Sequence, residues 1–180
     1  MTPQFQAPVL ETKYCALGKD LALKDCEIEG YASLFGAADQ GGDIVQKGAY
    51  VRSLGARRQP VRMLWQHDPA RPIGVWTDIR EDGKGLYVKG RILADVQDGR
   101  EALALLEAGA IDGLSIGYRT VQAERAAAGG RKLIEIDLWE VSVVTFPMLP
   151  EARVQSGEEP GDALAQDLAE AFAAARAMLA

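Results

Sequence analysis

Short apolar runs alternate with glycine, proline and aspartate between residues 26 and 147, a pattern typical of a mainly β domain with a few inserted helices. The runs predict six strands, at residues 28–35, 61–66, 74–80, 86–93, 113–121 and 133–146. Residues 81–85, Glu-Asp-Gly-Lys-Gly, lie between two of these strands and predict a hairpin turn, because glycine tolerates the positive φ angles of tight turns. We therefore expect an α+β fold that is mainly β with flanking helices.

Two helices are predicted inside this domain, at residues 99–108 and 48–54. Asp98 and Glu101 have capping-box spacing at the start of the first helix, and Gly109 is a suitable residue to end it. The second helix has weak caps, so its limits follow only from the helical spacing of its apolar side chains.

The composition changes after Pro150. Residues 151–161 are rich in glutamate, glycine, serine and proline and predict a linker. Residues 162–180 place leucine and phenylalanine on one stripe of an alanine-rich amphipathic helix, which either docks on its own domain or mediates interaction or oligomerisation. We therefore divide the chain into a domain at residues 1–150, a linker and a C-terminal helical tail.

Composition and charge narrow the functional classes. The 180 residues contain 20 Lys+Arg and 26 Asp+Glu, a formal net charge of −6, which is not expected of a dedicated nucleic-acid binder. No signal-like N-terminus or membrane-length apolar stretch occurs, so we expect a cytoplasmic protein without a membrane partner. Cys15, Cys26 and the single histidine, His67, do not form a zinc-site pattern, and we expect neither metal nor cofactor.

Residues 113–117, Gly-Leu-Ser-Ile-Gly, match the GxSxG pattern of α/β-hydrolases. The context disagrees with that fold, because the next four residues are β formers and the only histidine precedes the serine. In a strand, Ser115 shares a face with Gly113 and Gly117. Glycines there permit close approach of another backbone, such as a substrate peptide, and a bulge or tight barrel corner is the alternative.

Two further side chains are candidates for proton-transfer chemistry. His67 follows a predicted strand at a position that suits a general base, with a structural or surface role as the alternative. Glu140 is the one charge in the apolar second half of the last predicted strand, where a carboxylate must be hydrogen-bonded, paired or neutralised. The alternative, equally well supported, is that Glu140 has a structural role as the partner of an arginine, such as Arg91 or Arg119. Asp137 lies on the other strand face, where water can solvate it.

Three sequence blocks occur in order along the chain. They are Trp65-Gln66-His67-Asp68-Pro69 with Pro72-Ile73-Gly74, then Gly109-Ala110-Ile111-Asp112-Gly113-Leu114-Ser115-Ile116-Gly117-Tyr118, and finally Leu138-Trp139-Glu140-Val141-Ser142-Val143-Val144-Thr145-Phe146-Pro147. The blocks resemble the histidine motif, the serine motif and the following block of the capsid-maturation (prohead) proteases of tailed bacteriophages and of related prophage or gene-transfer-agent particles. The likeness covers about residues 29–153.

This resemblance implies the fold of the herpesvirus assembly proteases, a β-barrel flanked by helices. It implies that Ser115 is the nucleophile and His67 the general base. The herpesvirus enzymes use a second histidine as the third residue, which this chain lacks, and the separation from the serine favours Glu140 in that role, with Asp137 in reserve. The related fold also points to a loop at residues 125–131 as the source of oxyanion-stabilising N–H groups.

The implied function is a serine endopeptidase that cleaves the major capsid protein with its scaffold segment, and also itself, inside an immature capsid. An extended substrate would pair with the edge of the strand near Gly113 and Gly117. A catalytically silent β-barrel that serves as a scaffold or structural module of a phage-like particle is the alternative. The presence of Ser115, His67 and Glu140 together argues against that alternative. An esterase function is a further alternative, but only the GxSxG pattern supports it.

Overall fold

The computed structural model of the chain describes residues 11–15, 26–56, 59–126, 129–147 and 149, and at residues 11–15 it describes the backbone. These residues form eight strands and two helices. In chain order they are β1 (Glu11–Cys15), β2 (Glu27–Leu34), β3 (Ile44–Val45), α1 (Val51–Gly55), β4 (Arg62–Trp65), β5 (Asp68–Glu81), β6 (Gly85–Ile92), α2 (Gln97–Glu107), β7 (Gly113–Arg125) and β8 (Arg131–Val144).

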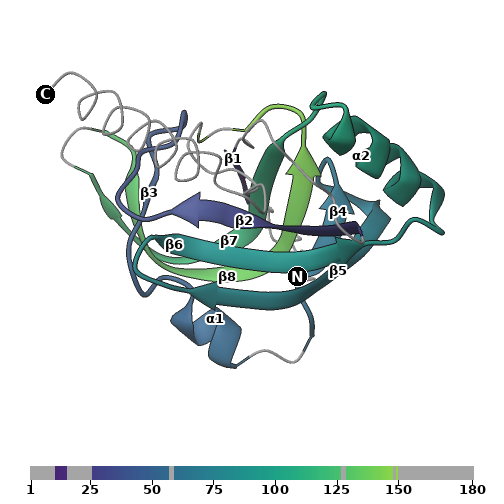
Figure 1. The fold of residues 1–180 in the computed structure, drawn as a ribbon. Helices are drawn as coiled ribbons and strands as arrows, with labels where there is room; N and C mark the ends of the chain where they lie inside the picture. The colour runs from purple at the N-terminus through teal and green to yellow at the C-terminus, as the bar shows by residue number, and fades with distance from the viewer. Residues whose placement is uncertain (1–10, 16–25, 57–58, 127–128, 148, 150–180) are drawn as a thin grey trace, which may run out of the picture.

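The eight described strands belong to one sheet, with the order β1-β7-β8-β4-β5-β6-β2 and with β3 added to β8. The sheet curls into a half-barrel (Figure 1), so that β2 returns against β7 and β1. Neighbouring strands are antiparallel except that β3 and β4 both run parallel to β8. Helix α1 packs on β8 and β5, and α2 packs on β5 and β6. The expected mainly β fold with flanking helices is confirmed.

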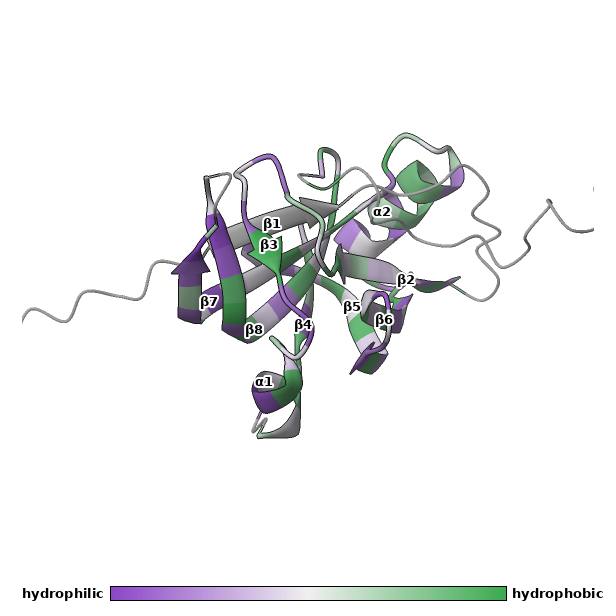
Figure 2. Cartoon of the chain, turned by 90° about the vertical axis from the view of Figure 1, so that its left-hand side faces the viewer, coloured by the Kyte–Doolittle hydropathy of each residue, from purple (hydrophilic) through white to green (hydrophobic). Residues whose placement is uncertain are grey.

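The hairpin of β7 and β8 provides the part of the sheet that matters for chemistry. Polar and apolar residues alternate along both strands (Figure 2), as expected where one face is buried and the other is solvated. The first six residues of β7 and the last five of β8 are buried, so there the sheet is covered on both faces. Polar side chains at this end of the hairpin are therefore shielded from water.

The observed elements differ from the predicted ones at two of their starts. Strand β5 begins at Asp68, earlier than the predicted residue 74. Helix α2 begins after Val96, which makes no side-chain capping hydrogen bond, so the predicted capping box is wrong. Asp98 instead forms an ion pair with Arg71, at 2.6 Å between Nη2 and Oδ1, and this guanidinium lowers the pKa of Asp98. The linker and helix predicted for residues 151–180 lie outside the described residues.

Asp82 organises the turn between β5 and β6, where the predicted hairpin is confirmed. Its Oδ1 accepts the backbone N–H groups of Lys84 at 2.7 Å and Gly85 at 3.0 Å, and its Oδ2 accepts the hydroxyl of Tyr31 at 2.6 Å. The hydrogen bond to Asp82 raises the pKa of Tyr31 to about 12, and the same bond lowers the pKa of Asp82. The turn is therefore tied to β2 by a charge-assisted bond.

Replacing Tyr31 with phenylalanine tests this contact. Because a partly buried hydrogen bond to a carboxylate contributes about 1–2 kcal/mol, the free energy of unfolding at pH 7 should fall by that amount. Folding lowers the pKa of Asp82, so the contribution is present above the ordinary value of 3.8 and is lost as pH falls through the folded-state pKa. Denaturant titrations should show the two proteins converging in acid. A gap that stays constant to the lowest accessible pH would contradict the assignment.

Candidate active site

His67 is the second residue of the two-residue turn that joins β4 to β5, where Trp65 and Asp68 form the closing pair. Gln66 and His67 have φ angles of 52° and 61°, the sign that a type I′ hairpin turn requires at both positions. Neither residue is glycine, so each carries backbone strain of roughly 1 kcal/mol or more. Such strain persists only where surrounding contacts hold the turn in place.

The end of β8 and the residue after it, Thr145, supply those contacts. The backbone N–H of Gln66 donates to the carbonyl of Val143 at 3.0 Å, and that of His67 donates to Ser142 Oγ at 3.2 Å. The side chain of Gln66 donates to Thr145 Oγ1 at 2.7 Å and accepts the Thr145 N–H at 3.3 Å. These bonds fix the turn, and with it the imidazole, against β8.

The imidazole of His67 is hydrogen-bonded to the carboxylate of Glu140, with 2.5 Å between Nδ1 and Oε1. The other carboxylate oxygen, Oε2, accepts the hydroxyl of Ser142 at 2.5 Å. An ionised carboxylate can only accept, so this pattern assigns the proton to Nδ1 and the lone pair of the ring to Nε2. The two side chains are only 10% and 4% exposed, which makes the pair a nearly dry charge-assisted contact.

Gly117 provides the space that this carboxylate occupies. It lies opposite Glu140 in the register of β7 and β8, and a Cβ added to it would lie 2.0 Å from Glu140 Oε1. The sequence pointed to a glycine that admits another backbone, such as a substrate peptide. The structure corrects this expectation for Gly117, because the group that approaches it is the Glu140 side chain.

Ser115 lies on the same face of the sheet, two residues before Gly117, and directly opposite Ser142. Facing residues on neighbouring strands have Cβ atoms about 5 Å apart. The three residues predicted for the site, Ser115, His67 and Glu140, are thus gathered around Ser142. Ser115 is fully buried. The outer edge of β7 beside it is paired with β1, with Tyr14 as the backbone partner of Ser115.

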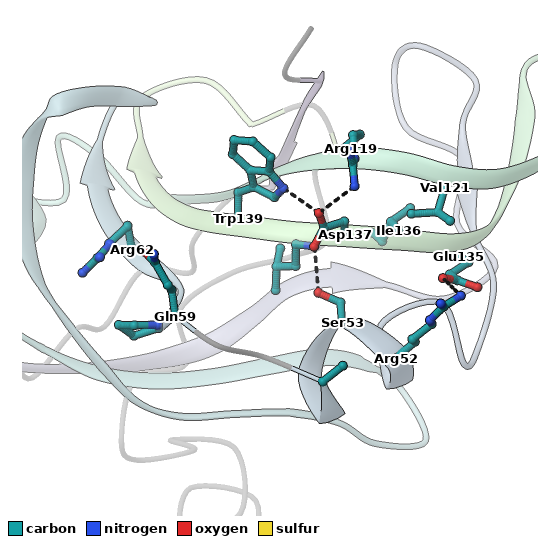
Figure 3. A pocket seen from close by; sticks show the side chains of 13 residues that line it. Arg52, Ser53, Gln59, Arg62, Arg119, Val121, Glu135, Ile136, Asp137 and Trp139 are labelled. Atoms are coloured by element: carbon teal, nitrogen blue, oxygen red, sulfur yellow. Dashed lines mark hydrogen bonds and ion pairs between the residues drawn. The ribbon is translucent and has the colours of Figure 1, made fainter. Parts of the chain in front are cut away.

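Asp137, the reserve candidate, lies on the same sheet face as Glu140, and the expectation that it lies on the other face is wrong. Trp139 is an extra residue at a β-bulge, so Gly117 pairs with Glu140 whereas Arg119, on the same face of β7, pairs with Asp137. It accepts hydrogen bonds from Trp139 Nε1 at 2.9 Å and from Arg119 at 3.3 Å (Figure 3). It lines an open groove of about 720 Å³ between α1 and β8, and Glu140 is not among the residues that line this groove. Arg119 therefore pairs with Asp137, and the proposed pairing of Glu140 with an arginine is not what the structure contains.

The described ends of the loop at residues 125–131 lie far from Ser115 along the hairpin of β7 and β8. The loop closes this hairpin, where Arg125 pairs with Arg131, whereas Ser115 lies ten positions earlier on β7. At about 3.3 Å per residue the strand separates them by roughly 30 Å. This separation along the hairpin does not support the expectation that the loop supplies oxyanion-stabilising N–H groups.

Sequence reasoning missed Ser142 and Gln66. Ser142 stands two positions after Glu140 on the same strand face, so strand alternation could have singled it out as the polar neighbour of a buried charge. Nothing in the sequence indicates the role of Gln66, because that role depends on how the turn approaches β8 in the folded protein.

Among the described residues, no group of three or more His, Cys, Asp or Glu side chains is arranged to hold a metal ion. The thiol of Cys26 is free. Neither of the two helices in this part of the chain is long and apolar enough to cross a bilayer.

A serine, an imidazole and a buried carboxylate around one face of a curled β-sheet form the residue set that serine hydrolases use. The model of the caudovirus prohead serine protease family matches residues 17–167, and the chain belongs to this family.

Individual relatives agree with this membership. The chain is 33% identical to the prohead protease of Enterobacteria phage HK97 over 129 residues, which are 70% of this chain and 57% of that protein. It is 30% identical to the prohead protease of Escherichia phage T5 over 125 residues, 67% of this chain and 58% of that protein. The chain thus spans a little over half the length of these relatives. A capsid polyprotein of Pseudomonas phage PAJU2 is 30% identical over 114 residues, 59% of this chain and 17% of that protein.

A solved structure supports the fold. The capsid assembly protease of bacteriophage T4 superposes with a TM-score of 0.62, covering 79% of this chain and 100% of that chain at 19% identity. The mainly β architecture predicted from the sequence is therefore shared with a capsid protease.

Replacing Gly117 with alanine should separate Glu140 from His67 while leaving the fold intact. The added methyl meets the end of a flexible side chain rather than backbone, so the carboxylate can be displaced without a shift of the strands, at the cost in stability of breaking its buried pair with His67. Because His67 is the only histidine, its two ring nitrogens give one readable set of NMR signals. We expect the wild type to show the Nδ1–H tautomer and Gly117→Ala to show a mixture of tautomers.

Gly55→Ala is the matched control, because a Cβ at Gly55 meets nothing within 4 Å. Its ring-nitrogen signals should equal those of the wild type. Unchanged signals in a folded Gly117→Ala protein would show that Gly117 does not make room for the pair.

Proposed function

We propose that this chain is a serine endopeptidase that cleaves capsid and scaffold protein during procapsid maturation. The observation that carries the proposal is the hydrogen bond from the sole imidazole to a buried carboxylate, on the sheet face that also bears Ser115. Membership of the prohead serine protease family and the names of the relatives, which include prohead proteases and a capsid polyprotein, support the same conclusion.

In the proposed reaction, Ser115 attacks a peptide carbonyl while Nε2 of His67 takes the hydroxyl proton. The imidazolium then gives this proton to the leaving amine, and the acyl-enzyme forms on Ser115. Water, deprotonated by the same imidazole, hydrolyses the ester and restores the serine. Throughout, Glu140 accepts the Nδ1 proton in its hydrogen bond, which holds the tautomer and stabilises the imidazolium.

Glu140 is the better third residue than Asp137. The carboxylate of Glu140 contacts the imidazole, whereas that of Asp137 contacts Arg119 and the Trp139 indole. An orienting group must touch the ring that it orients, so the hydrogen bonds of the two carboxylates favour Glu140.

The proposed substrate is an extended segment that adds to β7 beside Ser115. One edge of β7 is paired with β8 and the other with β1. A peptide that pairs with β7 there must therefore take the place of β1. This requirement fits the complete burial of Ser115 in the structure without substrate.

We propose the capsid protein with its scaffold segment, and other copies of this chain, as protein partners. The chain would be made in the cytoplasm and act inside the procapsid, without a nucleic-acid or membrane partner. A catalytically silent barrel that serves as a scaffold or structural module is the competing function. The dry contact between His67 and Glu140 disfavours it, because burying a carboxylate costs free energy that a purely structural strand avoids with an apolar residue.

Co-expression with the cognate major capsid protein tests the function. The wild type should shorten the capsid chain, and Ser115→Ala and His67→Ala should each reduce this processing by about 10³-fold or more, because nucleophile and base act as a unit. Mass spectrometry of the capsid protein N-terminus measures the outcome. Full processing by the Ser115→Ala protein would refute the serine mechanism and leave the structural module as the better account.

Amide variants of Glu140 and Asp137 form a matched pair that tests which carboxylate orients the imidazole. Glu140→Gln keeps the shape but loses the charge beside the imidazole, so the cleavage rate should fall by about 10² to 10⁴-fold. Asp137→Asn should stay within about twofold of the wild type, since its contacts are with Arg119 and Trp139 and not with the imidazole. Rates measured on a capsid-derived peptide decide between them. The reverse ranking would transfer the orienting role to Asp137.

Removing residues 1–15 tests whether β1 covers the substrate edge. Deletion of β1 should raise kcat/KM for a capsid-derived peptide by about tenfold, as expected when an edge that is mostly occupied becomes free. Removing residues 1–10 leaves β1 in place and is the control. Equal kcat/KM values for the two truncated proteins, both folded, would mean that substrate does not replace β1.

A further inference from the structure

We propose that Ser142 is a positioning residue of the catalytic centre, whose hydroxyl holds the Glu140 carboxylate and the turn that carries His67 in one arrangement. The inference rests on the proposed protease function and adds to it a residue outside the serine, histidine and carboxylate set.

The Ser142 hydroxyl both donates and accepts a hydrogen bond within this centre. It donates to Glu140 Oε2 at 2.5 Å and accepts the backbone N–H of His67 at 3.2 Å. The side chain is fully buried, so water does not compete for either bond. One hydroxyl thus bridges the carboxylate and the backbone of the residue whose ring that carboxylate contacts.

The two bonds restrain two different freedoms. A glutamate held by His67 at one oxygen can still rotate about its last side-chain bond, and the second bond, at Oε2, removes that rotation. The His67 backbone has a positive φ of 61°, which costs free energy and persists only when the surroundings hold it. A buried N–H also needs an acceptor, and Ser142 Oγ is that acceptor.

Its position in the sheet explains why this role falls to residue 142. Ser142 faces Ser115 across the hairpin of β7 and β8 and pairs with Leu64 of β4 just before the turn. It therefore lies where the strand of the nucleophile and the strand of the base meet. Its own proton is committed to Glu140, so it positions the other groups rather than attacking substrate.

Ser33 is a matched control for the loss of a buried serine hydroxyl. It is 1% exposed, lies on β2, and its Oγ has no hydrogen-bond partner among the described residues. Ser33→Ala removes the same atom as Ser142→Ala, without touching the pair of His67 and Glu140.

The experiment measures kcat and KM on a capsid-derived peptide, together with the NMR resonance of the His67 Nδ1 proton, which is unique because the chain has one histidine. Ser142→Ala should lower kcat by about 10- to 100-fold, since small misplacement of catalytic groups has effects of this size, with KM within about twofold. Its Nδ1 proton should lose the downfield resonance of a short hydrogen bond. Ser142→Thr, which keeps the hydroxyl, should retain the resonance, and Ser33→Ala should match the wild type.

A folded Ser142→Ala protein with the kcat and the Nδ1 resonance of the wild type would overturn the proposal. If this variant does not fold, Ser142→Cys takes its place, because a thiol is a weaker donor of similar shape; wild-type kcat and resonance would again overturn it. An inactive wild type would refute the protease function instead. The resonances of wild type and variant would still decide whether Ser142 holds the pair.

Discussion

The buried carboxylate of Glu140 is the constraint on which the site depends. Taking an ionised carboxylate out of water costs several kcal/mol unless hydrogen bonds and a charge partner compensate. His67 and Ser142 each donate to one of its oxygens, and Gly117 leaves the space that the carboxylate fills. The two hydrogen bonds compensate for the burial of the carboxylate, and the glycine makes that burial sterically possible. A single buried charge thereby couples residues from β7, β8 and the turn after β4.

Strand β8 makes this coupling possible because it is central. It pairs with β7 on one side and with β4 on the other, so Ser115 and the His67 turn approach it from opposite edges. The strained turn keeps its conformation through hydrogen bonds to the end of β8, including the bond to Val143. The sheet therefore pre-organises the imidazole and the carboxylate before substrate arrives, which is how enzymes avoid reorganisation during the reaction.

Local sequence patterns correctly predicted the elements whose structure depends on interactions between residues close in sequence. Alternation along β7 and β8 and the glycines of the turn at residues 81–85 indicated strands and hairpin correctly. Strand β1 was missed because its register with β7, rather than a hydrophobic pattern of its own, makes it a strand. From the sequence, either His67 or an arginine such as Arg119 could be the partner of Glu140. In the structure Glu140 contacts His67 and Arg119 contacts Asp137, an outcome that depends on the register of the strands. The positive φ angles at the His67 turn depend on contacts with β8, which no local signal encodes.

The central claim is that His67 and its carboxylate activate Ser115. Labelling the full chain with a fluorophosphonate, which reacts with activated serines, tests it most directly when peptide mass spectrometry locates the adduct. We predict one adduct, on Ser115, in the wild type and none in His67→Ala, with Ser142 unlabelled in both. Labelling of Ser142 in place of Ser115, or equal labelling of Ser115 with and without the imidazole, would contradict the account.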